Sequence, residues 1–501
     1  MGDMILRDYQ LAAIDSLRRE FLAGKRNVIL HSPTGAGKTI TAASLIKSAQ
    51  NKGRKVLFLA NRRELIFQAR DTLAGCGVEA GVIMAGEEPS FSSAVQVASM
   101  QTYVRRMNLE DLDSNPWFHA AAVIVVDECH GAISPSYQKI LKQYGDKTIT
   151  VGLTATPCRG DGRGLGEYFD ALVSTLGIGE LIDQGYLVPV RYFVPSTPDL
   201  DKIRTVAGDY DRKELGARMD KAHLVGDIVD NWLKICPDRA TIVFAVNVRH
   251  SIHIVDQFLS VGITAEHVDA KTPAEERADI LKRLRNGKTQ VVSNVGILCE
   301  GFDFPAAGSI ILARPTKSLG LYLQMAGRGL RPYPGKKDCI LIDHGGTVDE
   351  HGLVEWAREW SLDGKEKAWK EPKKKDTLEK VVQCRACDLV FSGGSVCPDC
   401  GTAVKLFGKK INVVEADLVE AGEKKEKGSV AEKRIFLGML KHYIPRQKNP
   451  NPKRIIGSFK GRYGVWPHHS YADVAPIEPD QAFLAYMQHQ AIKWAKGGKR
   501  V

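Results

Sequence analysis

The sequence predicts an α/β protein with two tandem parallel-sheet lobes, followed by a four-Cys module and a small basic, mainly helical C-terminal domain. Apolar, strand-like runs alternate with helix-like segments twice along the chain, as parallel sheets with helices on both faces require. Two Cys-x-x-Cys pairs follow the second set of runs, and the positive charge is concentrated beyond them. A chain of 501 residues is expected to hold about three or four domains.

The two expected sheets are defined by apolar runs, with a less regular stretch around residues 195–225 between the two sets. In the first lobe the runs are Val28–His31, Val56–Ala60, Val95–Ala98, Ala122–Val126 and Ile149–Gly152. In the second lobe they are Thr241–Val246, Glu266–Val268, Gln290–Ser293, Ser309–Ala313 and Cys339–Ile342. We therefore expect a first lobe over residues 1–190, a second lobe over 191–360, a charged linker over 361–380, the four-Cys module over 381–405, a further linker over 406–430 and the basic domain over 431–501.

The first strand-like run leads into a glycine-rich turn, Ser-Pro-Thr-Gly-Ala-Gly-Lys-Thr. A strand, such a turn and a helix form a phosphate-binding loop, in which backbone amides and the helix N-terminus surround an anion. The lysine would reach the β- and γ-phosphates of ATP, and the last threonine would bind Mg²⁺. The alternative is a glycine-rich turn without a ligand. The nucleotide contacts expected from this loop are Thr34, Gly35, Gly37, Lys38 and Thr39.

Two adjacent carboxylates follow the fourth predicted strand. The apolar run Ala121–Val126 fits a strand buried on both faces, and it ends in Asp127-Glu128-Cys129-His130. Open α/β sheets bind ligands at the carboxyl ends of their strands. We expect Asp127 to hold Mg²⁺ and Glu128 to orient and deprotonate the water that attacks the γ-phosphate. The alternative is a solvated acidic turn.

In this order, these features resemble superfamily 2 helicases of the DEAD/DEAH type, and further segments extend the resemblance over residues 5–343. The segments are Leu6–Gln10, Ala60–Leu65, Ser99–Thr102, Gly152–Pro157, Val243–Ala245 with Asn247, Gly301–Asp303 and Gln324–Pro332. The resemblance implies two RecA-like lobes and a nucleic-acid-dependent ATPase that acts as a DNA helicase or translocase. It also implies roles for Arg7 and Gln10 at the adenine, for Gly301 and Asp303 at the nucleotide, for Gln324, Arg328 and Arg331 in catalysis, and for Arg62, Arg63, Gln101, Thr102 and Asn247 at the nucleic acid.

Hydrolysis needs a cation that reaches the γ-phosphoryl group late in the reaction, when negative charge develops there. Arg328 and Arg331, which we expect at the start of a helix in the second lobe, can supply it. They would reach the phosphates only when the lobes close, so hydrolysis would be tied to domain motion. The alternative for Arg331 is a surface ion pair.

Cys384, Cys387, Cys397 and Cys400 form two Cys-x-x-Cys knuckles. Four thiolates at this spacing can surround Zn²⁺ tetrahedrally. Because so short a module cannot bury a core of its own, we expect the metal to hold it together. A structural Zn²⁺ is therefore predicted, with a redox dithiol pair or an iron–sulfur cluster as the alternatives. A catalytic zinc is disfavoured, because thiolates would fill all four positions.

The formal net charge of +11 comes entirely from the tail. Residues 365–501 carry 27 Lys and Arg against 15 Asp and Glu. Basic groups interleaved with Tyr443, Phe459, Tyr463 and Trp466 suit a phosphate backbone and stacked bases. We expect DNA as the partner, whether single-stranded, duplex or forked, with RNA less favoured. A solvated basic face, or one that docks a protein or an anionic membrane, is the alternative.

No apolar stretch approaches about 18 residues, so no membrane contact through a transmembrane helix is expected, and the N-terminus leaves no room for a signal peptide. The cysteines outside the knuckles are scattered, which fits a reducing bacterial or phage-infected cytosol.

The segment Leu321–Asp343 and the knuckles are similar to the RadD-like branch of bacterial and phage DNA helicases. Two other functions stay open: an ATP-gated DNA clamp or remodeller, and the motor subunit of a restriction complex.

Overall fold

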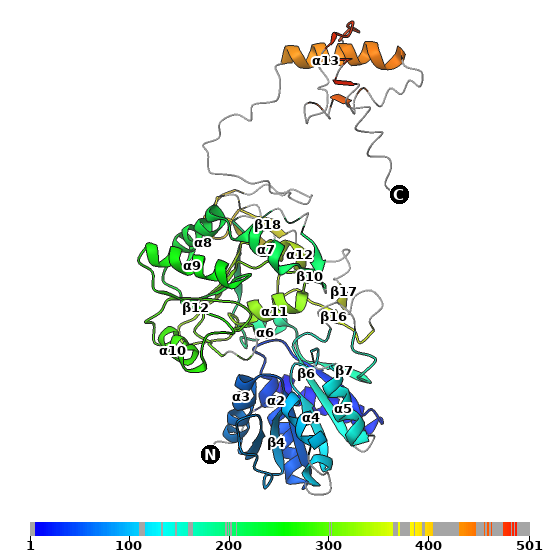
Figure 1. The fold of residues 1–501 in the computed structure, drawn as a ribbon, viewed down its shortest axis with the longest axis vertical. Helices are drawn as coiled ribbons and strands as arrows, with labels where there is room; N and C mark the ends of the chain where they lie inside the picture. Colours follow the sequence, from blue (N-terminus) through cyan, green and yellow to red (C-terminus); the bar gives the residue numbers. More distant parts are fainter. Residues whose placement is uncertain are drawn as a thin grey trace. The chain divides into compact units, whose positions relative to one another are not determined.

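The computed structural model divides the chain into two compact units, Met1–Glu415 and Ala416–Val501, which are described separately (Figure 1). The structure describes residues 6–109, 116–131, 134–145, 148–158, 164–195, 198, 200, 203–206, 208–299, 301, 303–363, 369–370, 381–384, 386–392, 396–403 and 430–446. It also describes residues 455, 458–459, 462, 474–481, 483–484 and 486–487. None of the helices described is long and apolar enough to cross a membrane.

The first sheet has seven strands, all parallel, in the order β3-β4-β2-β5-β6-β1-β7. Its elements are α1 (Asp8–Leu22), β1 (Asn27–His31), α2 (Lys38–Asn51), β2 (Lys55–Ala60), α3 (Arg63–Gly75), β3 (Ala80–Ile83), β4 (Val95–Ser99), α4 (Met100–Leu109), η1 (Pro116–His119), β5 (Ala121–Val126), α5 (Pro135–Tyr144), β6 (Ile149–Thr154) and β7 (Ala171–Ser174). The five strands predicted for this lobe are confirmed. The short strands β3 and β7, which lie at the two edges of the sheet, were not predicted.

Both faces of the first sheet are buried. In β1, Val28 and Leu30 face a core that includes residues of α1, α2 and α3, whereas Ile29 faces a separate core that includes residues of α4 and α5. A strand covered on both faces needs apolar side chains at successive positions, which explains the continuous apolar runs in the sequence. The loops that follow the strands are left at the carboxyl edge of the sheet, where ligands bind in this class of fold.

The second sheet has eight strands in the order β12-β13-β11-β14-β15-β8-β19-β18. Its first six strands are parallel, whereas β19 pairs antiparallel with β8, and β18 pairs antiparallel with β19. Strand β9 pairs with β10, and β16 with β17, in two separate antiparallel two-stranded sheets. The elements of this part of the chain are α6 (Ile178–Asp183), β8 (Val190–Phe193), β9 (Thr205–Val206), β10 (Asp209–Tyr210), α7 (Arg212–Met219), α8 (Ala222–Ile235), β11 (Thr241–Phe244), α9 (Val248–Ser260), β12 (Ala265–Val268), α10 (Ala274–Arg285), β13 (Val291–Asn294), β14 (Ser309–Leu312), α11 (Leu319–Gly327), β15 (Cys339–Asp343), α12 (Thr347–His351), β16 (Glu359–Trp360), β17 (Trp369–Lys370), β18 (Val381–Gln383) and β19 (Leu389–Ser392). The five strands predicted here are also confirmed.

The four-Cys module is built onto the second lobe. Its strands β18 and β19 extend the second sheet, and Cys384 and Cys397 lie in the same core as Phe193, Val243 and Ile340. We expected the metal alone to hold this module together. The shared sheet and the shared core provide a second source of stability, which the sequence pattern around the cysteines did not reveal.

The chain returns to the first lobe after α12, before it forms the last two strands of the second sheet. The backbone N–H of Gly166 donates to the carbonyl of Leu362 at 2.9 Å, and the ring of Trp360 lies 5.3 Å from that of His31. The first residues of the linker predicted over 361–380 therefore lie against the first lobe. Most of that linker, and of the linker predicted over 406–430, lies outside the described residues.

The C-terminal unit contains α13 (Val430–Tyr443) and η3 (Ile444–Arg446). Phe436 and Phe459 are buried in its core, and the guanidinium of Arg462 lies 4.8 Å from the ring centres of Phe436 and of Tyr486. Phe459 is fully buried, so it is not available to stack on a base as the sequence suggested. Two of the aromatic residues named from the sequence, Tyr463 and Trp466, lie outside the described residues.

Candidate functional site

The glycine-rich turn connects β1 to α2 in the first lobe. Gly35 and Gly37 have φ angles of 88° and 80°, a region that residues with a side chain rarely adopt, and Gly37 caps α2. Thr34 is buried in the turn, and Thr39 lies in the first turn of the helix. The loop thus has the backbone that an anion-binding loop at a helix N-terminus needs.

Lys38 is the first residue of α2, and its ammonium donates to the carbonyl of Ser32 at 3.2 Å across the turn. Burial lowers the pKa of Lys38, whereas the nearby carboxylates of Glu128 and Asp127 act to raise it. The lysine and the two carboxylates, which are about 90 residues apart in sequence, therefore belong to one site, as the motif spacing predicted.

Residues at the start of α1 contact this loop. The amide of Gln10 and the hydroxyl of Tyr9 both donate to the carbonyl of Ala36, at 3.3 Å and 2.8 Å. The guanidinium of Arg7 donates to the Tyr9 hydroxyl at 3.1 Å and lies 4.4 Å from the ring centre of Tyr186. Arg7 and Gln10 thus lie beside the phosphate loop, and Gln10 is bonded to its backbone.

The two carboxylates follow β5. The backbone N–H of Glu128 donates to the Asp127 carboxylate at 3.1 Å, and Glu128 has a φ of 46°, which is uncommon for a residue with a side chain. His130 Nδ1 lies 3.3 Å from a carboxylate oxygen of Glu128 and 3.0 Å from the hydroxyl of Thr154. A residue held in a strained conformation between specific partners is typical of functional sites.

Glu128 is ionised at neutral pH. Burial acts to raise its pKa, but the contact with His130 and the charges of Lys38 and Arg328 outweigh burial and lower the pKa to about 2. A carboxylate with so low a pKa orients a water well but removes its proton poorly. The negative charge of a bound triphosphate would offset the cations and raise this pKa again.

Two arginines of the second lobe face this site. Arg328 is the C-cap of α11 and Arg331 lies beyond it, so the expectation that they begin a helix is wrong. Gly327 is the last residue of the helix, and Pro332 beyond it could not continue a helix. Arg331 pairs with the carboxylate of Asp303, and its Cγ lies 3.4 Å from where a Cβ on Gly35 would be. Arg328 donates to the carbonyl of Cys299 at 3.0 Å.

The two lobes meet closely at this point. A Cβ added to Gly327 would lie 2.6 Å from the Cβ of Thr34 in the phosphate loop, and one added to Gly301 would lie 3.0 Å from Leu65. Gln324 is buried on α11, one turn before Gly327. The residues predicted for the nucleotide and for catalysis are thus brought to one interlobe region by two separate sheets.

The arginines predicted to contact nucleic acid at the end of β2 already have protein partners. Arg62 Nη1 lies 3.5 Å from the carbonyl of Gly296 in the second lobe, and Arg63 pairs with Glu87 at 2.9 Å. A pocket of about 760 Å³ opens beside Arg62, between α3 and the second lobe. It is lined by cationic and acidic side chains alike, namely Arg62, Glu64, Asp71, Arg277, Arg285 and Asp303.

The other predicted nucleic-acid contacts follow β4 and β11. Gln101 and Thr102 lie in the first turn of α4, and Gln101 is exposed. Asn247 caps α9, where its side-chain oxygen accepts from the backbone N–H of His250 at 2.9 Å. Every predicted contact thus lies at the carboxyl edge of a sheet, although Asn247 also has this capping role.

His31 was not singled out from the sequence, although it lies at this site. Its ring nitrogens lie 3.2 Å from the hydroxyl of Ser174 and 3.2 Å from the carbonyl of Ala155. Burial, followed by the charge of Lys38, lowers the pKa of His31 to about 3, so the imidazole is neutral. The sequence signal that could have identified His31 is its place at the end of a buried apolar strand, directly before the phosphate loop.

The two Cys-x-x-Cys knuckles have the same backbone structure. In each, the residue after the second cysteine donates its N–H to the carbonyl of the first, from Asp388 to Cys384 at 2.9 Å and from Gly401 to Cys397 at 3.0 Å. Asp388 and Gly401 have φ angles of 59° and 71°. The two equivalent loops bring all four thiols together.

The sulfur positions fit a tetrahedral metal. The four Sγ atoms lie within 4.8 Å of one another, with 3.5 Å between Cys384 and Cys400 and 3.6 Å between Cys387 and Cys397. Tetrahedral Zn–S bonds of about 2.3 Å would place the sulfurs about 3.8 Å apart. A disulfide needs about 2.0 Å. The cluster could therefore hold a metal ion.

We expect Cys397→Ser to release the metal and to destabilise the second lobe as well as the knuckles. Cys397 is buried in the core of that lobe, where an unpaired hydroxyl and a lost ligand both cost free energy, about 1–3 kcal/mol. Metal analysis should show the loss, and thermal melting should show a Tm lower by several degrees. The matched control is Cys76→Ser in the first lobe, which should keep its metal. Full metal retention by Cys397→Ser would contradict the assignment.

Two family models match the chain. Residues 3–159 match the family described as "Type III restriction enzyme, res subunit", and residues 221–332 match the "Helicase conserved C-terminal domain". The first match contains the phosphate loop, Asp127 and Glu128, and the second contains Arg328 and Arg331.

Several named proteins are similar in sequence. The chain is 32% identical over 415 residues to the "51.5 kDa protein" of Lactococcus phage (isolate 7-9), which covers 82% of this chain and 86% of the phage protein. It is 32% identical over 361 residues to "Putative ATP-dependent helicase IRC3" of Saccharomyces cerevisiae, covering 68% of this chain and 51% of that protein. It is 24% identical over 389 residues to "DNA 3'-5' translocase XPB2" of Sulfurisphaera tokodaii, covering 69% of this chain and 82% of that protein. The chain thus spans about half the length of the yeast relative.

The fold is similar to that in "The fragment structure of a putative HsdR subunit of a type I restriction enzyme from Vibrio vulnificus YJ016". The TM-score is 0.54 at 24% identity, and the match covers 69% of this chain and 67% of the other. This likeness concerns the two-lobed fold.

Proposed function

Since this chain belongs to the superfamily 2 helicases, whose helicase domains hydrolyse ATP, we propose that it is a DNA-dependent ATPase that hydrolyses ATP between its two lobes and moves along DNA. The observation that carries this proposal is the position of Arg331. This residue of the second lobe lies beside Gly35 in the phosphate loop of the first, although it is also paired with Asp303.

In this proposal each residue acts at a defined part of ATP. The loop amides and Lys38 bind the phosphates, and Asp127 would hold Mg²⁺, which would neutralise charge on the β- and γ-phosphates. Glu128 orients the attacking water. Arg331 exchanges Asp303 for the γ-phosphoryl group as charge develops there. Because the cation and the loop come from different lobes, any change in the interlobe angle changes the rate, which couples hydrolysis to motion.

DNA is the proposed substrate because a relative is named as a DNA translocase and the chain has a strongly basic tail. Arg62, Arg63, Gln101, Thr102 and Asn247 are proposed to contact the backbone at the carboxyl edges of the two sheets. RNA is the weaker candidate.

The four cysteines are proposed to bind structural Zn²⁺, as in the RadD-like helicases that the sequence resembles, and iron in the purified protein would contradict this assignment.

Strand displacement tests whether the motor is a helicase. We expect ATP-dependent displacement of one strand from a forked DNA duplex, in parallel with ATP turnover. ATP turnover without displacement would instead favour the alternatives, an ATP-gated clamp or remodeller, or the motor subunit of a restriction complex, which the match to a restriction-enzyme family makes a specific candidate. Displacement of RNA strands alone would overturn the assignment of DNA.

A further inference from the structure

Lys336 lies in the loop Tyr333–Asp338, which connects Arg331 to β15. Its ammonium donates to three carbonyl oxygens, those of Gly329 at 2.6 Å, of Arg331 at 3.0 Å and of Pro305 at 3.0 Å. An ammonium has three N–H donors, so all of them are used.

These three carbonyls lie on both sides of the Arg331–Asp303 pair. Two belong to the segment that carries Arg331, and the third, of Pro305, lies two residues after Asp303. Neither backbone segment is part of a helix or strand at these positions, so the ladder bonds that fix regular structure are absent from them. Lys336 supplies bonds that join the two segments.

We propose that Lys336 is a positioning residue, which holds the backbone of Arg331 against that of Pro305 so that the Arg331 guanidinium is directed at the phosphate loop. The inference rests on the proposed ATPase function, since it concerns the orientation of the arginine that completes that site. Lys336 itself acts through the two backbone segments. A misplacement of about 1 Å in a catalytic group can cost about 10²-fold in rate, so the loss of these bonds should be visible in kcat.

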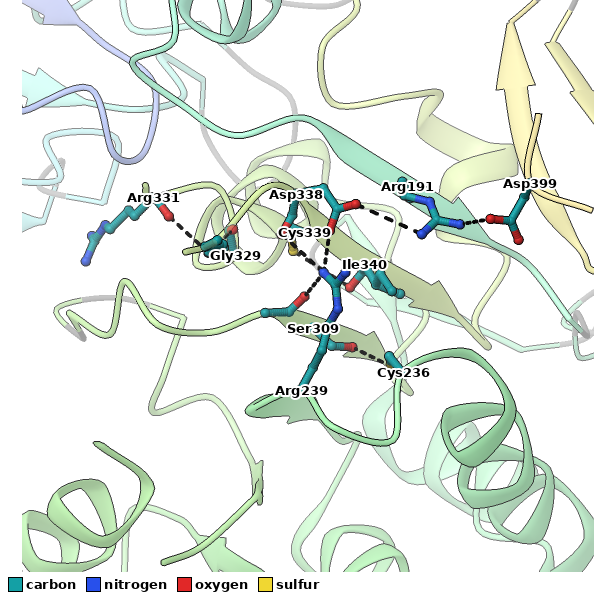
Figure 2. Close-up of polar contacts among 12 residues, drawn as sticks. Arg191, Cys236, Arg239, Ser309, Gly329, Arg331, Asp338, Cys339, Ile340 and Asp399 are labelled. Atoms are coloured by element: carbon teal, nitrogen blue, oxygen red, sulfur yellow. Dashed lines mark hydrogen bonds and ion pairs between the residues drawn. The ribbon is translucent and has the colours of Figure 1, made fainter. Parts of the chain in front are cut away.

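The far end of the same loop is fixed by other contacts (Figure 2). Asp338 pairs with Arg239 and lies 4.0 Å from Arg191, which pairs with Asp399 in the second knuckle. This chain of charges ties the loop to the four-Cys module without involving the Lys336 ammonium. Removal of Lys336 should therefore loosen the end of the loop near Arg331 while the end near β15 stays in place.

Protonation of Lys336 gives the inference a second consequence. Burial lowers the pKa of Lys336 to about 8; Cys339 and Asp338 oppose the shift, and Arg239 and Arg331 add to it. Below this pKa the ammonium donates a hydrogen bond to each of the three carbonyls. Above it a neutral amine has only two donors and directs a lone pair at a carbonyl oxygen. The turnover rate should therefore fall as the pH rises through about 8.

The test compares the full-length wild-type chain with Lys336→Met, Lys336→Arg and Asp338→Asn, using ATP turnover with single-stranded DNA below and above pH 8. We expect Lys336→Met to lower kcat about 10- to 100-fold with little change in the KM for ATP. Lys336→Arg, whose side chain stays protonated, should keep much of the activity and lose the fall above pH 8. Asp338→Asn removes a charge from the same loop and a group that raises the pKa of Lys336, so the comparison is made well below pH 8, where kcat should change less than about threefold.

The outcomes separate this inference from the proposed function. A wild-type chain that does not hydrolyse ATP would overturn both. An active wild-type chain whose kcat and pH profile are unchanged in Lys336→Met would overturn the inference alone, as would an equal loss of kcat in Asp338→Asn. If Lys336→Met does not fold, as judged by thermal melting, Lys336→Arg decides: a flat profile supports the positioning role, and the wild-type profile overturns it.

Discussion

Glu128→Gln should bind ATP normally and hydrolyse it about 10²- to 10⁴-fold more slowly than the wild-type chain. The amide has nearly the shape of the carboxylate but lacks the negative charge that orients the attacking water. Removal of that charge also removes its repulsion of the γ-phosphate, so the affinity for ATP should not fall. Nucleotide binding measured by titration calorimetry, beside steady-state turnover with saturating DNA, separates the two effects.

Two further variants control this experiment. Lys38→Ala should lose both affinity and turnover, because Lys38 contacts the phosphates in the ground state as well as in the transition state. Glu214→Gln removes a partly exposed carboxylate of α7, paired with Arg204, and should leave both quantities unchanged. Near-normal turnover by Glu128→Gln would show that another group orients the water.

Arg331→Ala should lower kcat by about 10²-fold or more and leave the affinity for ATP almost unchanged. Arg331 pairs with Asp303 in this structure, so it would have to break that ion pair in order to bind ATP in the ground state. In the transition state the developing charge outweighs the pair, which is why the effect falls on turnover. Turnover and nucleotide affinity, measured on the same preparation, provide the comparison.

Arg283→Ala is the matched control, because it also breaks an arginine–carboxylate pair in the second lobe, with Glu266, but on the surface between α10 and β12. This control should leave kcat unchanged. An Arg331→Ala variant with a raised KM and an intact kcat would identify Arg331 as a binding residue.

The central strands of both sheets could be predicted because each is buried on two faces and needs apolar side chains at successive positions. That signal is weak in β3 and β7, which lie at a sheet edge and bury only some of their residues. It also failed for β8 and β19, whose pairing joins segments about 200 residues apart. No local pattern specifies a partner at that distance.

The residues of the candidate site likewise fall into those that the sequence located and those that it did not. The phosphate loop and the two carboxylates could be located because each follows directly from a strand and a short motif. The Arg331–Asp303 pair and the three bonds of Lys336 could not, since they depend on how two irregular segments approach each other in the folded lobe. Gln10 and Asn247 also make backbone bonds that a motif role does not reveal.

The most direct test of the account is the steady-state ATP turnover of the full-length chain, with Mg²⁺, as a function of single-stranded DNA concentration. Closure of the lobes around ATP should be favoured by DNA that contacts both of them, so turnover should rise with DNA to a plateau and depend on salt as phosphate contacts do. The same rise should be absent from Arg331→Ala. Turnover that is independent of DNA, or the absence of turnover in the wild-type chain, would contradict an ATP site completed by two lobes acting on nucleic acid.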